Sequence, residues 1–475
     1  MSIELFILGL SAIVGLLLSY KWISDYAHSL FWISFILYFD PGGFFSGISD
    51  GNIIGRIKFY DLFFALMMLT WSVSDLWKKR ITSINAHFRF LIVSIALCSL
   101  YFLLATGYVI PNLYGYENLP LFLQKNRQFF YALPVFIAVY QFTYFNFNGI
   151  IKPLLFISLA SLIAYLITLT TGIELLPTLT WSRYGENDRI SLLSYGLAYW
   201  LLPMGVIVLF LRDSIYGWQR KTILVCMALM FITIVLTLTR REFLRIFFML
   251  LIVPLMTNYI SGRSIIKGYR KLFFWVVFPA AIIWIFFPAY FVFAGQLIAD
   301  TWVLFLGNGN AGGDYRVSGD GDLVYVKQII SEHPFFGIGY YPAPWEKVLD
   351  MKAYGSNLAL ALDASNEVPI YGSMMRLGLV GLIVPAILHF RMLYFCIQCL
   401  KLLKHYGYLL RDCVMEYLLI LTCIYFIFTL FTTDLFSLFL EYYHFPAFTL
   451  FTCMIAMLSA LVARLQTRIN FIKNA

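Results

Sequence analysis

The chain has 475 residues, of which 61% are hydrophobic and only 12% charged, with a formal net charge of +9. Its mean hydropathy is +0.81. A soluble domain cannot bury that much apolar surface, whereas a bilayer about 30 Å thick accommodates it in stretches of roughly 20 residues. The composition therefore excludes an ordinary soluble protein and predicts an all-α polytopic bundle of transmembrane helices. The positive charge is then better explained by Lys and Arg in cytoplasmic loops than by nucleic-acid binding.

The apolar stretches predict about 12–13 spans. The second is interrupted by Asp40-Pro41-Gly42-Gly43 and is either a span or a re-entrant segment, so the side of the N-terminus stays open. The first lacks a basic start and a cleavage site, so a retained anchor is expected. The stretches are Leu5–Tyr20, His28–Phe45, Phe59–Trp77, Phe90–Ile110, Phe129–Phe145, Pro153–Thr171, Ile190–Leu211, Ile223–Leu238, Leu244–Tyr259, Phe273–Phe293, Val368–Phe395, Tyr417–Phe431 and Pro446–Val462.

From the third span onward, basic residues recur at every second loop, which places those loops in the cytoplasm. The alternate loops are then external, and they include one long polar segment, residues 295–367. A single membrane domain over residues 1–475 is expected, with this segment as its large outer loop. The basic residues are Lys78, Lys79, Arg80, Lys152, Arg212, Arg220, Lys221, the stretch Arg263–Lys271, Lys401, Lys404, Arg411, Arg464, Arg468 and Lys473.

The outer loop contains the residues that best fit a surface reaction. A Val-Tyr-Val-Lys-Gln-Ile-Ile run predicts a short amphipathic helix or strand leading to a turn at His333-Pro334. Asp320-x-Asp322 resembles the metal pair of nucleotide-sugar transferases, but nucleotide sugars are not available outside the cytoplasm, so no metal site is expected. The aromatic side chains of the loop are either sugar-stacking platforms or interfacial anchors. They are Tyr340, Tyr341 and Trp345.

Arginines gather on the side that the positive-inside rule disfavours. Arginine binds phosphate oxygens in two-point geometry, so several converging arginines would form a pyrophosphate site. Pairing with Glu242 or with lipid headgroups is the alternative explanation. The arginines are Arg183 and Arg189 in one outer loop, Arg240, Arg241 and Arg245 after another, and Arg316 in the long loop.

These motifs resemble the O-antigen ligase/polymerase superfamily. Leu-Thr-Leu-Thr-Arg240 is similar to its small-polar-plus-Arg motif, and Arg316 followed by His333-Pro334-Phe-Phe-Gly337-Ile-Gly339 is similar to its HP-x-x-G-x-G pattern. Ser365-Asn366-Glu367, and then Arg376-Leu-Gly378-Leu-Val-Gly381, resemble its polar pair followed by Gly-Leu-x-Gly at the start of a span. The order and spacing of the motifs cover most of the chain.

The resemblance implies a metal-independent and cofactor-free glycosyltransferase at the periplasmic face of the bacterial inner membrane. Its donor and acceptor would be undecaprenyl-pyrophosphate-linked glycans, with membrane lipid, a chain-length regulator and a flippase as further partners and no nucleic acid. By analogy, Arg189, Arg240 and Arg316 would hold the donor pyrophosphate, with Arg183 and Arg241 near them. Glu367 is the expected general base, and Asn366 and His333 complete the predicted catalytic set; a helix-capping role for Glu367 and a turn-shaping role for His333 are the alternatives.

Four interpretations remain in competition, and one of them is that the long outer loop is a binding surface without catalysis. Ligases of the superfamily carry a His directly before the Asn of the polar pair, whereas this chain has Ser365, which favours an O-antigen or exopolysaccharide polymerase over an O-antigen ligase. The third candidate is a transporter, such as a flippase of the same lipid-linked glycans. Flippases need ionisable residues along a central cavity and symmetry between halves, and neither pattern is visible in the sequence.

Overall fold

The computed structural model describes residues 26–38, 52–54, 57–76, 128–171, 180–182, 190–192, 200–211, 218–237, 240–262, 323–338, 369–409, 412–433 and 447–474, with isolated residues between 89 and 108 and between 266 and 295. These parts of the chain are almost entirely helical. The strands form two short antiparallel pairs: β1 (Asn52–Ile54) with β2 (Ile57–Lys58), and β3 (Thr180–Ser182) with β4 (Ile190–Leu192).

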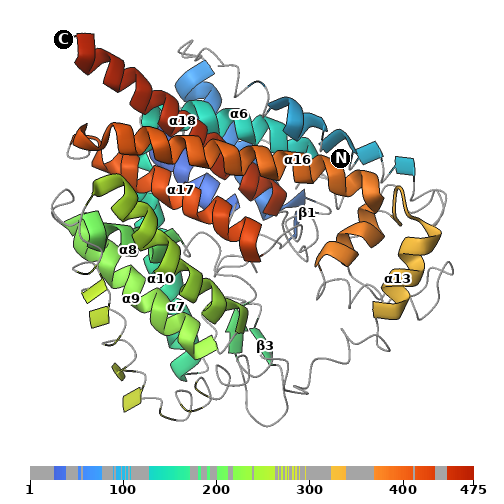
Figure 1. Ribbon diagram of the computed structural model, residues 1–475, viewed down its shortest axis with the longest axis horizontal. Helices are drawn as coiled ribbons and strands as arrows, with labels where there is room; N and C mark the ends of the chain where they lie inside the picture. Colours follow the sequence, from blue (N-terminus) through green and yellow to red (C-terminus); the bar gives the residue numbers. More distant parts are fainter. Residues whose placement is uncertain are drawn as a thin grey trace, which may run out of the picture.

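The helices form two groups that pack on each other (Figure 1). One group consists of α6 (Gln128–Asn146), α16 (Pro369–His405), α17 (Val414–Thr433) and α18 (Ala447–Asn474). The other consists of α7 (Ile151–Thr171), α8 (Leu201–Leu211), α9 (Trp218–Thr237) and α10 (Arg240–Ser261). Outside both groups, α13 (Leu323–Glu332) lies against one end of α16. The remaining helical elements are Tyr26–Tyr38, α3 (Phe59–Trp71), the π-helix η1 (Ser72–Leu76) and the 3₁₀ turns η3 (Phe147–Gly149) and η6 (Gly407–Leu409).

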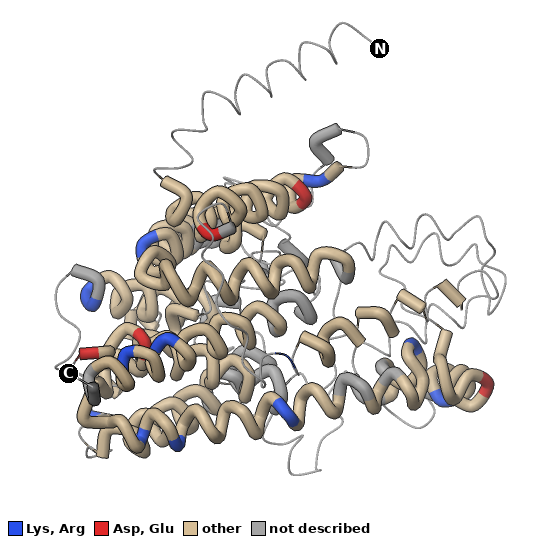
Figure 2. Tube along the Cα trace, turned by 90° about the horizontal axis from the view of Figure 1, so that it is seen from above, with Lys and Arg blue, Asp and Glu red and all other residues tan. Residues whose placement is uncertain are grey.

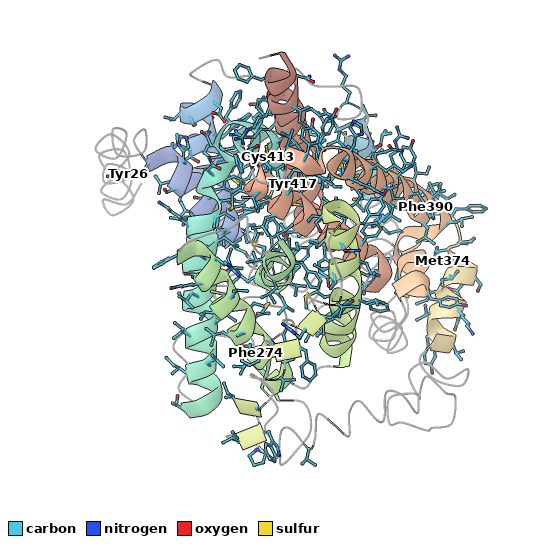
Figure 3. The ribbon with its side chains drawn as sticks, turned by 60° about the vertical axis from the view of Figure 1, so that its left-hand side comes forward. Tyr26, Phe274, Met374, Phe390, Cys413 and Tyr417 are labelled. Atoms are coloured by element: carbon cyan, nitrogen blue, oxygen red, sulfur yellow. The ribbon has the colours of Figure 1, made fainter. Side chains whose placement is uncertain are left out.

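The core lies where the two groups meet. Every residue of α8 is buried, and α8 packs on α9, α10 and α17. Tyr417 and Cys413 lie near the start of α17, inside the group of α6, α16, α17 and α18 (Figure 3), and both are completely buried. A helix that is apolar all round is stable only when surrounded by other apolar surface, which explains why α8 occupies the centre.

Local sequence signals explain several helix ends. α3 begins where the backbone N–H of Lys58 donates to the Asp61 carboxylate over 2.9 Å, an acid placed in the first turn. α10 ends before Gly262, whose φ of 61° suits a left-handed cap and whose N–H donates to the Asn258 carbonyl over 2.9 Å. Such caps satisfy main-chain groups that an apolar surrounding would otherwise leave unbonded.

Buried hydroxyls inside the helices bond to their own helix. Thr257 donates to the Val253 carbonyl over 2.7 Å, and Thr422 donates to the Leu418 carbonyl over the same distance. Any Thr in a helix can donate its hydroxyl to the carbonyl four residues earlier. It allows a polar side chain to sit in an apolar core without a partner from another helix, which is the arrangement that a low-dielectric environment requires.

Two helical stretches, Ala386–His405 and Thr452–Phe471, are long and apolar enough to cross a membrane, judged by length and composition among the described residues. A third arises if Phe130–Gly149 and Ile151–Ala164, bent by 81° at their junction, form one broken span. Shorter apolar helices of 10–17 residues are Tyr26–Tyr38, Ile92–Tyr101, Leu201–Leu211, Phe248–Ser261 and Val414–Phe428. The full set of 12–13 spans therefore stays a prediction.

Most of the predicted apolar stretches coincide with described helices, but Leu5–Tyr20 lies outside the described residues and Phe273–Phe293 is described only at isolated positions. Three stretches differ from expectation, one in its start and two in how they meet. The stretch predicted as Ile190–Leu211 begins with strand β4, and its helix starts only at Leu201. The β-branched Ile190 lies in a two-strand pair, so the start of this apolar run belongs to a strand and not to the first turns of a helix. The predicted spans on either side of Lys152 meet at 81°, whereas two successive spans in a hairpin would run antiparallel.

Candidate functional site

Most residues predicted for the site lie outside the part of the chain that the structure describes, and their roles stay predictions. His333 is described, as is the main chain of Arg240 and Arg241, the first two residues of α10. The site can therefore be built around His333 and the elements that it contacts. The residues outside the described ranges are Arg183, Arg189, Arg316, Asp320, Asp322, Tyr340, Tyr341, Trp345, Asn366 and Glu367.

The segment predicted as a helix or strand before His333 is the helix α13. It ends at Glu332 because Pro334 has no N–H and disfavours helical backbone in the residue before it. The N–H of His333 donates to the Ile329 carbonyl over 2.9 Å, and the N–H of Gly337 donates to the His333 carbonyl over 3.1 Å. The main chain of His333 thus shapes a turn, residues His333–Ile338, which is called the turn below.

The turn docks on a break in α16. The break is at Gly378, where φ is 66° and ψ is −176° instead of the helical values. At such a break, carbonyls on one side and N–H groups on the other lose their partners within the helix. Three main-chain hydrogen bonds to the turn replace them. They join Ile338 N–H to the Met375 carbonyl over 2.9 Å, Leu379 N–H to the Pro334 carbonyl over 2.9 Å and Val380 N–H to the Phe335 carbonyl over 3.2 Å.

The contact between turn and break is possible only with glycine on both sides. A Cβ atom on Gly337 would lie 2.5 Å from the carbonyl carbon of Arg376, and one on Gly378 would lie closer still to that of Phe335. Real side chains do not approach main chain so closely, and both glycines also have positive φ. The HP-x-x-G-x-G pattern and the Gly-Leu-x-Gly pattern are therefore two halves of one packing arrangement.

Two further residues at the break were not predicted as site residues. The hydroxyl of Tyr101 donates to the Leu377 carbonyl over 2.6 Å, which satisfies another main-chain group at the interrupted helix. Arg376 is only 2% exposed, and a guanidinium keeps its charge even when buried. Arg376 could have been predicted as a site residue, because an arginine inside an apolar stretch is unusual. Nothing in the sequence connects Tyr101 with Leu377, which is 276 residues away.

Four of the arginines predicted to bind pyrophosphate lie in or directly beside described elements, whereas Arg316 lies outside the described residues. Arg183 follows β3 and Arg189 precedes β4, and the last register pair between these strands is Ser182 with Ile190. β4 contacts α9, whose successor α10 begins at Arg240 (Figure 1). Arg183 and Arg189 thus flank the β3–β4 pair, which contacts α9, and Arg240 and Arg241 begin the helix that follows α9. The side chains of these four arginines lie outside the described part of the structure.

At the other end of the bundle, a buried carboxylate holds α17 and α18 together. Glu416, whose side chain is 3% exposed, lies 2.9 Å from Nη1 of Arg468 and 3.9 Å from Nε of Arg464. Arg464 also donates to the Tyr144 carbonyl of α6 over 2.8 Å. Figure 2 shows most Lys and Arg of the described residues toward the end where the C-terminus lies.

The described residues contain no group of three or more His, Cys, Asp or Glu side chains suited to a metal. Comparison of the chain with models of known protein families and with curated proteins finds no match. Function must therefore be inferred from the residues and their geometry.

Proposed function

We propose that the chain is a polysaccharide polymerase of the inner membrane. It joins undecaprenyl-pyrophosphate-linked oligosaccharide repeat units into O-antigen or a related surface polysaccharide at the periplasmic face. The proposal starts from the resemblance of the chain's motifs to the O-antigen ligase/polymerase superfamily, and two structural observations support it.

The first observation is the contact between the turn and the break. The HP-x-x-G-x-G and Gly-Leu-x-Gly patterns resemble the same superfamily and are about 40 residues apart in sequence. A chance likeness of two short patterns gives no reason for them to meet. Here they bond to each other through three main-chain hydrogen bonds and two glycine approaches. This cooperation supports treating both patterns as parts of one site.

The buried charge of Arg376 is a second support. It lies beside the break, where the turn fixes the main chain of Met375 and Leu379. A rigid segment that carries a cation suits a reaction with an anionic leaving group, because preorganised charge stabilises the transition state without reorganisation. The orientation inferred from the loop charges puts this break on the outer side, where lipid-linked glycans are the available donors.

In the proposed reaction, Arg189, Arg240 and Arg316 hold the donor pyrophosphate. The bond between the anomeric carbon and the pyrophosphate oxygen breaks, and the arginines stabilise the charge on the departing pyrophosphate. A hydroxyl of the acceptor repeat unit forms the new bond to that carbon. Glu367 takes the hydroxyl proton as general base. Tyr340, Tyr341 and Trp345 would stack against the sugars.

The ligase alternative uses the same donor but passes the glycan to lipid A–core. Ser365 stands where ligases have the His that precedes the Asn of the polar pair, so the base proposed for ligases is missing. The transporter alternative draws on the broken helix, since discontinuous helices form the central sites of transporters. In α16 the break is at Gly378, close to the start at Pro369, whereas transporter sites lie near the middle of the bilayer.

The deciding experiment is a gel of the surface glycans of the native host after deletion of this gene. A polymerase predicts lipid A–core that carries one repeat unit, with the ladder of longer chains lost. Loss of every repeat unit from lipid A–core, with long chains kept on the carrier lipid, would show a ligase. Loss of every repeat unit from lipid A–core and of long chains from the carrier lipid, with single lipid-linked units trapped on the cytoplasmic side, would show a flippase.

A further inference from the structure

One face of α16 is apolar and exposed from Leu379 to Ile397, about half of the length of the helix. The six residues on this face, called the apolar stripe, recur every three or four positions, so they lie on one side of the helix. The stripe is about 27 Å long at 1.5 Å per residue, close to the thickness of the hydrocarbon core of a bilayer. Phe390 projects from α16 at the margin of the molecule (Figure 3). The stripe comprises Leu379 (46% exposed), Ile383 (50%), Ile387 (55%), Phe390 (64%), Tyr394 (51%) and Ile397 (43%).

The two ends of the stripe differ. Beyond Ile397 come Lys401 and Lys404, cations that mark the cytoplasmic end of a span. At the other end, Leu379 directly follows the break at Gly378. Its N–H is bonded to the Pro334 carbonyl. The turn is therefore fixed at the level where the stripe begins.

The turn itself exposes two aromatic rings at this level. Phe335 is 61% exposed and Phe336 is 51% exposed, although their main chain is held by the break. The ring of Tyr108, 67% exposed, lies 6.5 Å from that of Phe336. Tyr is a residue of the aromatic belts of membrane proteins, and Phe is among the residues that segments lying on a membrane bury between headgroups and acyl chains. These three exposed rings beside the end of the apolar stripe therefore fit that boundary.

α13, which leads into the turn, has two different faces. Val326 and Ile329 are buried, and α13 packs on α16. The opposite face is exposed and polar apart from Val324, which is 44% exposed, and its polar side chains form local hydrogen bonds. Gln328 donates to the Glu332 carboxylate over 3.1 Å, and Ser331 donates to the Gln328 carbonyl over 2.6 Å. The polar side of α13 therefore faces water while the turn at its end exposes Phe335 and Phe336.

We propose that the turn is a membrane-interface anchor: Phe335 and Phe336 insert into the outer leaflet at the level of the headgroups, with α13 on the water side. The inference rests on the membrane orientation in the proposed function and goes beyond it, because it assigns a lipid-binding surface to the outer loop. The occupant is lipid, because the stripe has the length of the hydrocarbon core and aromatic rings mark its end. Burying the two rings holds the break at headgroup depth, where the phosphates of any lipid-linked molecule lie.

The test uses nitroxide spin labels on cysteines introduced one at a time into the full-length protein, reconstituted in vesicles of phosphatidylethanolamine and phosphatidylglycerol. Phe336→Cys reports on the turn, and Phe335→Cys is a second reporter in case one variant folds poorly. Ser331→Cys on the polar face of α13 is the matched control, and Ile387→Cys in the middle of the stripe reports the hydrocarbon core. The six described native cysteines are buried, and labelling of the parent chain gives the background.

Collision of each label with oxygen, which concentrates in lipid, is compared with collision with a water-soluble nickel complex. The label at 336 should favour oxygen several-fold more than the label at 331, and the label at 387 should favour oxygen most. Equal nickel access at 336 and 331, with 387 still in lipid, would overturn the anchor and leave the membrane placement intact. Nickel access at 387 would overturn the membrane placement itself. Dipolar broadening between labels at 336 would show that a second copy, not lipid, covers the turn, and would also overturn the proposal.

Discussion

Gly337 lies against the main chain next to Gly378, and Gly378 lies against the main chain next to Gly337. A Cβ on Gly337 would meet the carbonyl carbon of Arg376, two residues before Gly378, and a Cβ on Gly378 would meet that of Phe335, two residues before Gly337. Both residues have φ of 66°. This reciprocal approach allows the turn to replace the hydrogen bonds that α16 loses at its break, so the turn and the start of α16 form one packed unit.

Gly378→Ala should therefore destabilise the protein strongly. The substitution places a side chain in a region of φ/ψ that is essentially glycine-only and forces the turn away, for a combined cost of roughly 2–6 kcal/mol. Gly262→Ala is the matched control, because Gly262 also has positive φ but a Cβ added there would meet nothing within 4 Å; its cost should be about 1–2 kcal/mol. The midpoint of thermal unfolding in detergent measures both, and equal losses would contradict the close packing.

Tyr101→Phe should weaken the same unit by a smaller amount. The variant loses only the hydroxyl that donates to the Leu377 carbonyl over 2.6 Å, and a lost hydrogen bond of this kind costs about 1 kcal/mol. Tyr371→Phe removes a hydroxyl from an exposed tyrosine on the same half of α16 and serves as the control. Thermal unfolding that shifts equally in the two variants would argue against a role for Tyr101 at the break.

The helices could be predicted from the sequence because their signal is local. The apolar stretch Tyr417–Phe431 matches α17 closely, and Pro446–Val462 matches the first part of α18, which continues to Asn474. Length and hydropathy decide a helix in an apolar surrounding. The strand at Ile190 was missed because a run of three residues is too short to show either a strand or a helix period. Its three residues are held only by their partners in β3.

The site could be predicted only in part, because its contacts are long-range. The patterns around Gly337 and Gly378 can be recognised separately, but their meeting depends on three-dimensional packing. Tyr101 has no local signal at all, since its partner carbonyl belongs to a helix formed much later in the chain. Arg376 is part of a recognisable pattern, yet its burial follows only from how the turn and α16 pack.

Glu416→Gln should destabilise the end of the bundle that carries the C-terminus. The variant leaves Arg464 and Arg468 without the buried carboxylate between them. Breaking a fully buried pair costs about 3–5 kcal/mol, but these arginine side chains are 29% and 44% exposed, so roughly 1–3 kcal/mol is expected after solvent screening. Asp412→Asn is the control, because Asp412 is an exposed acid just before the start of α17. It should leave the unfolding temperature unchanged. A similar shift in both variants would mean that general charge, not this pairing, stabilises α17 and α18.

Polymer synthesis should persist in EDTA. The proposed reaction stabilises the departing pyrophosphate with arginines, which need no divalent ion. The measurement is incorporation of lipid-linked repeat units into polymer by the purified protein in vesicles, with and without chelator. Loss of activity in EDTA and recovery with Mg²⁺ or Mn²⁺ would reinstate Asp320 and Asp322 as metal ligands, because carboxylate oxygens are the ligands that these ions prefer.

Arg240→Ala and Arg316→Ala should each abolish polymer while the protein remains inserted and abundant. Each arginine is proposed to bind the pyrophosphate that departs from the donor, and removing one charge-assisted contact weakens the stabilisation of that group. Lys substitutions should restore activity only in part, because an ammonium keeps the charge but lacks the planar fork. Arg270→Ala, at an exposed arginine of the stretch expected in the cytoplasm, is the matched control and should retain the wild-type ladder on a glycan gel. Immunoblots of membranes give the protein level in each strain. Wild-type ladders in both Ala variants would rule out the pyrophosphate site, because two members of a converging anion site cannot both be dispensable.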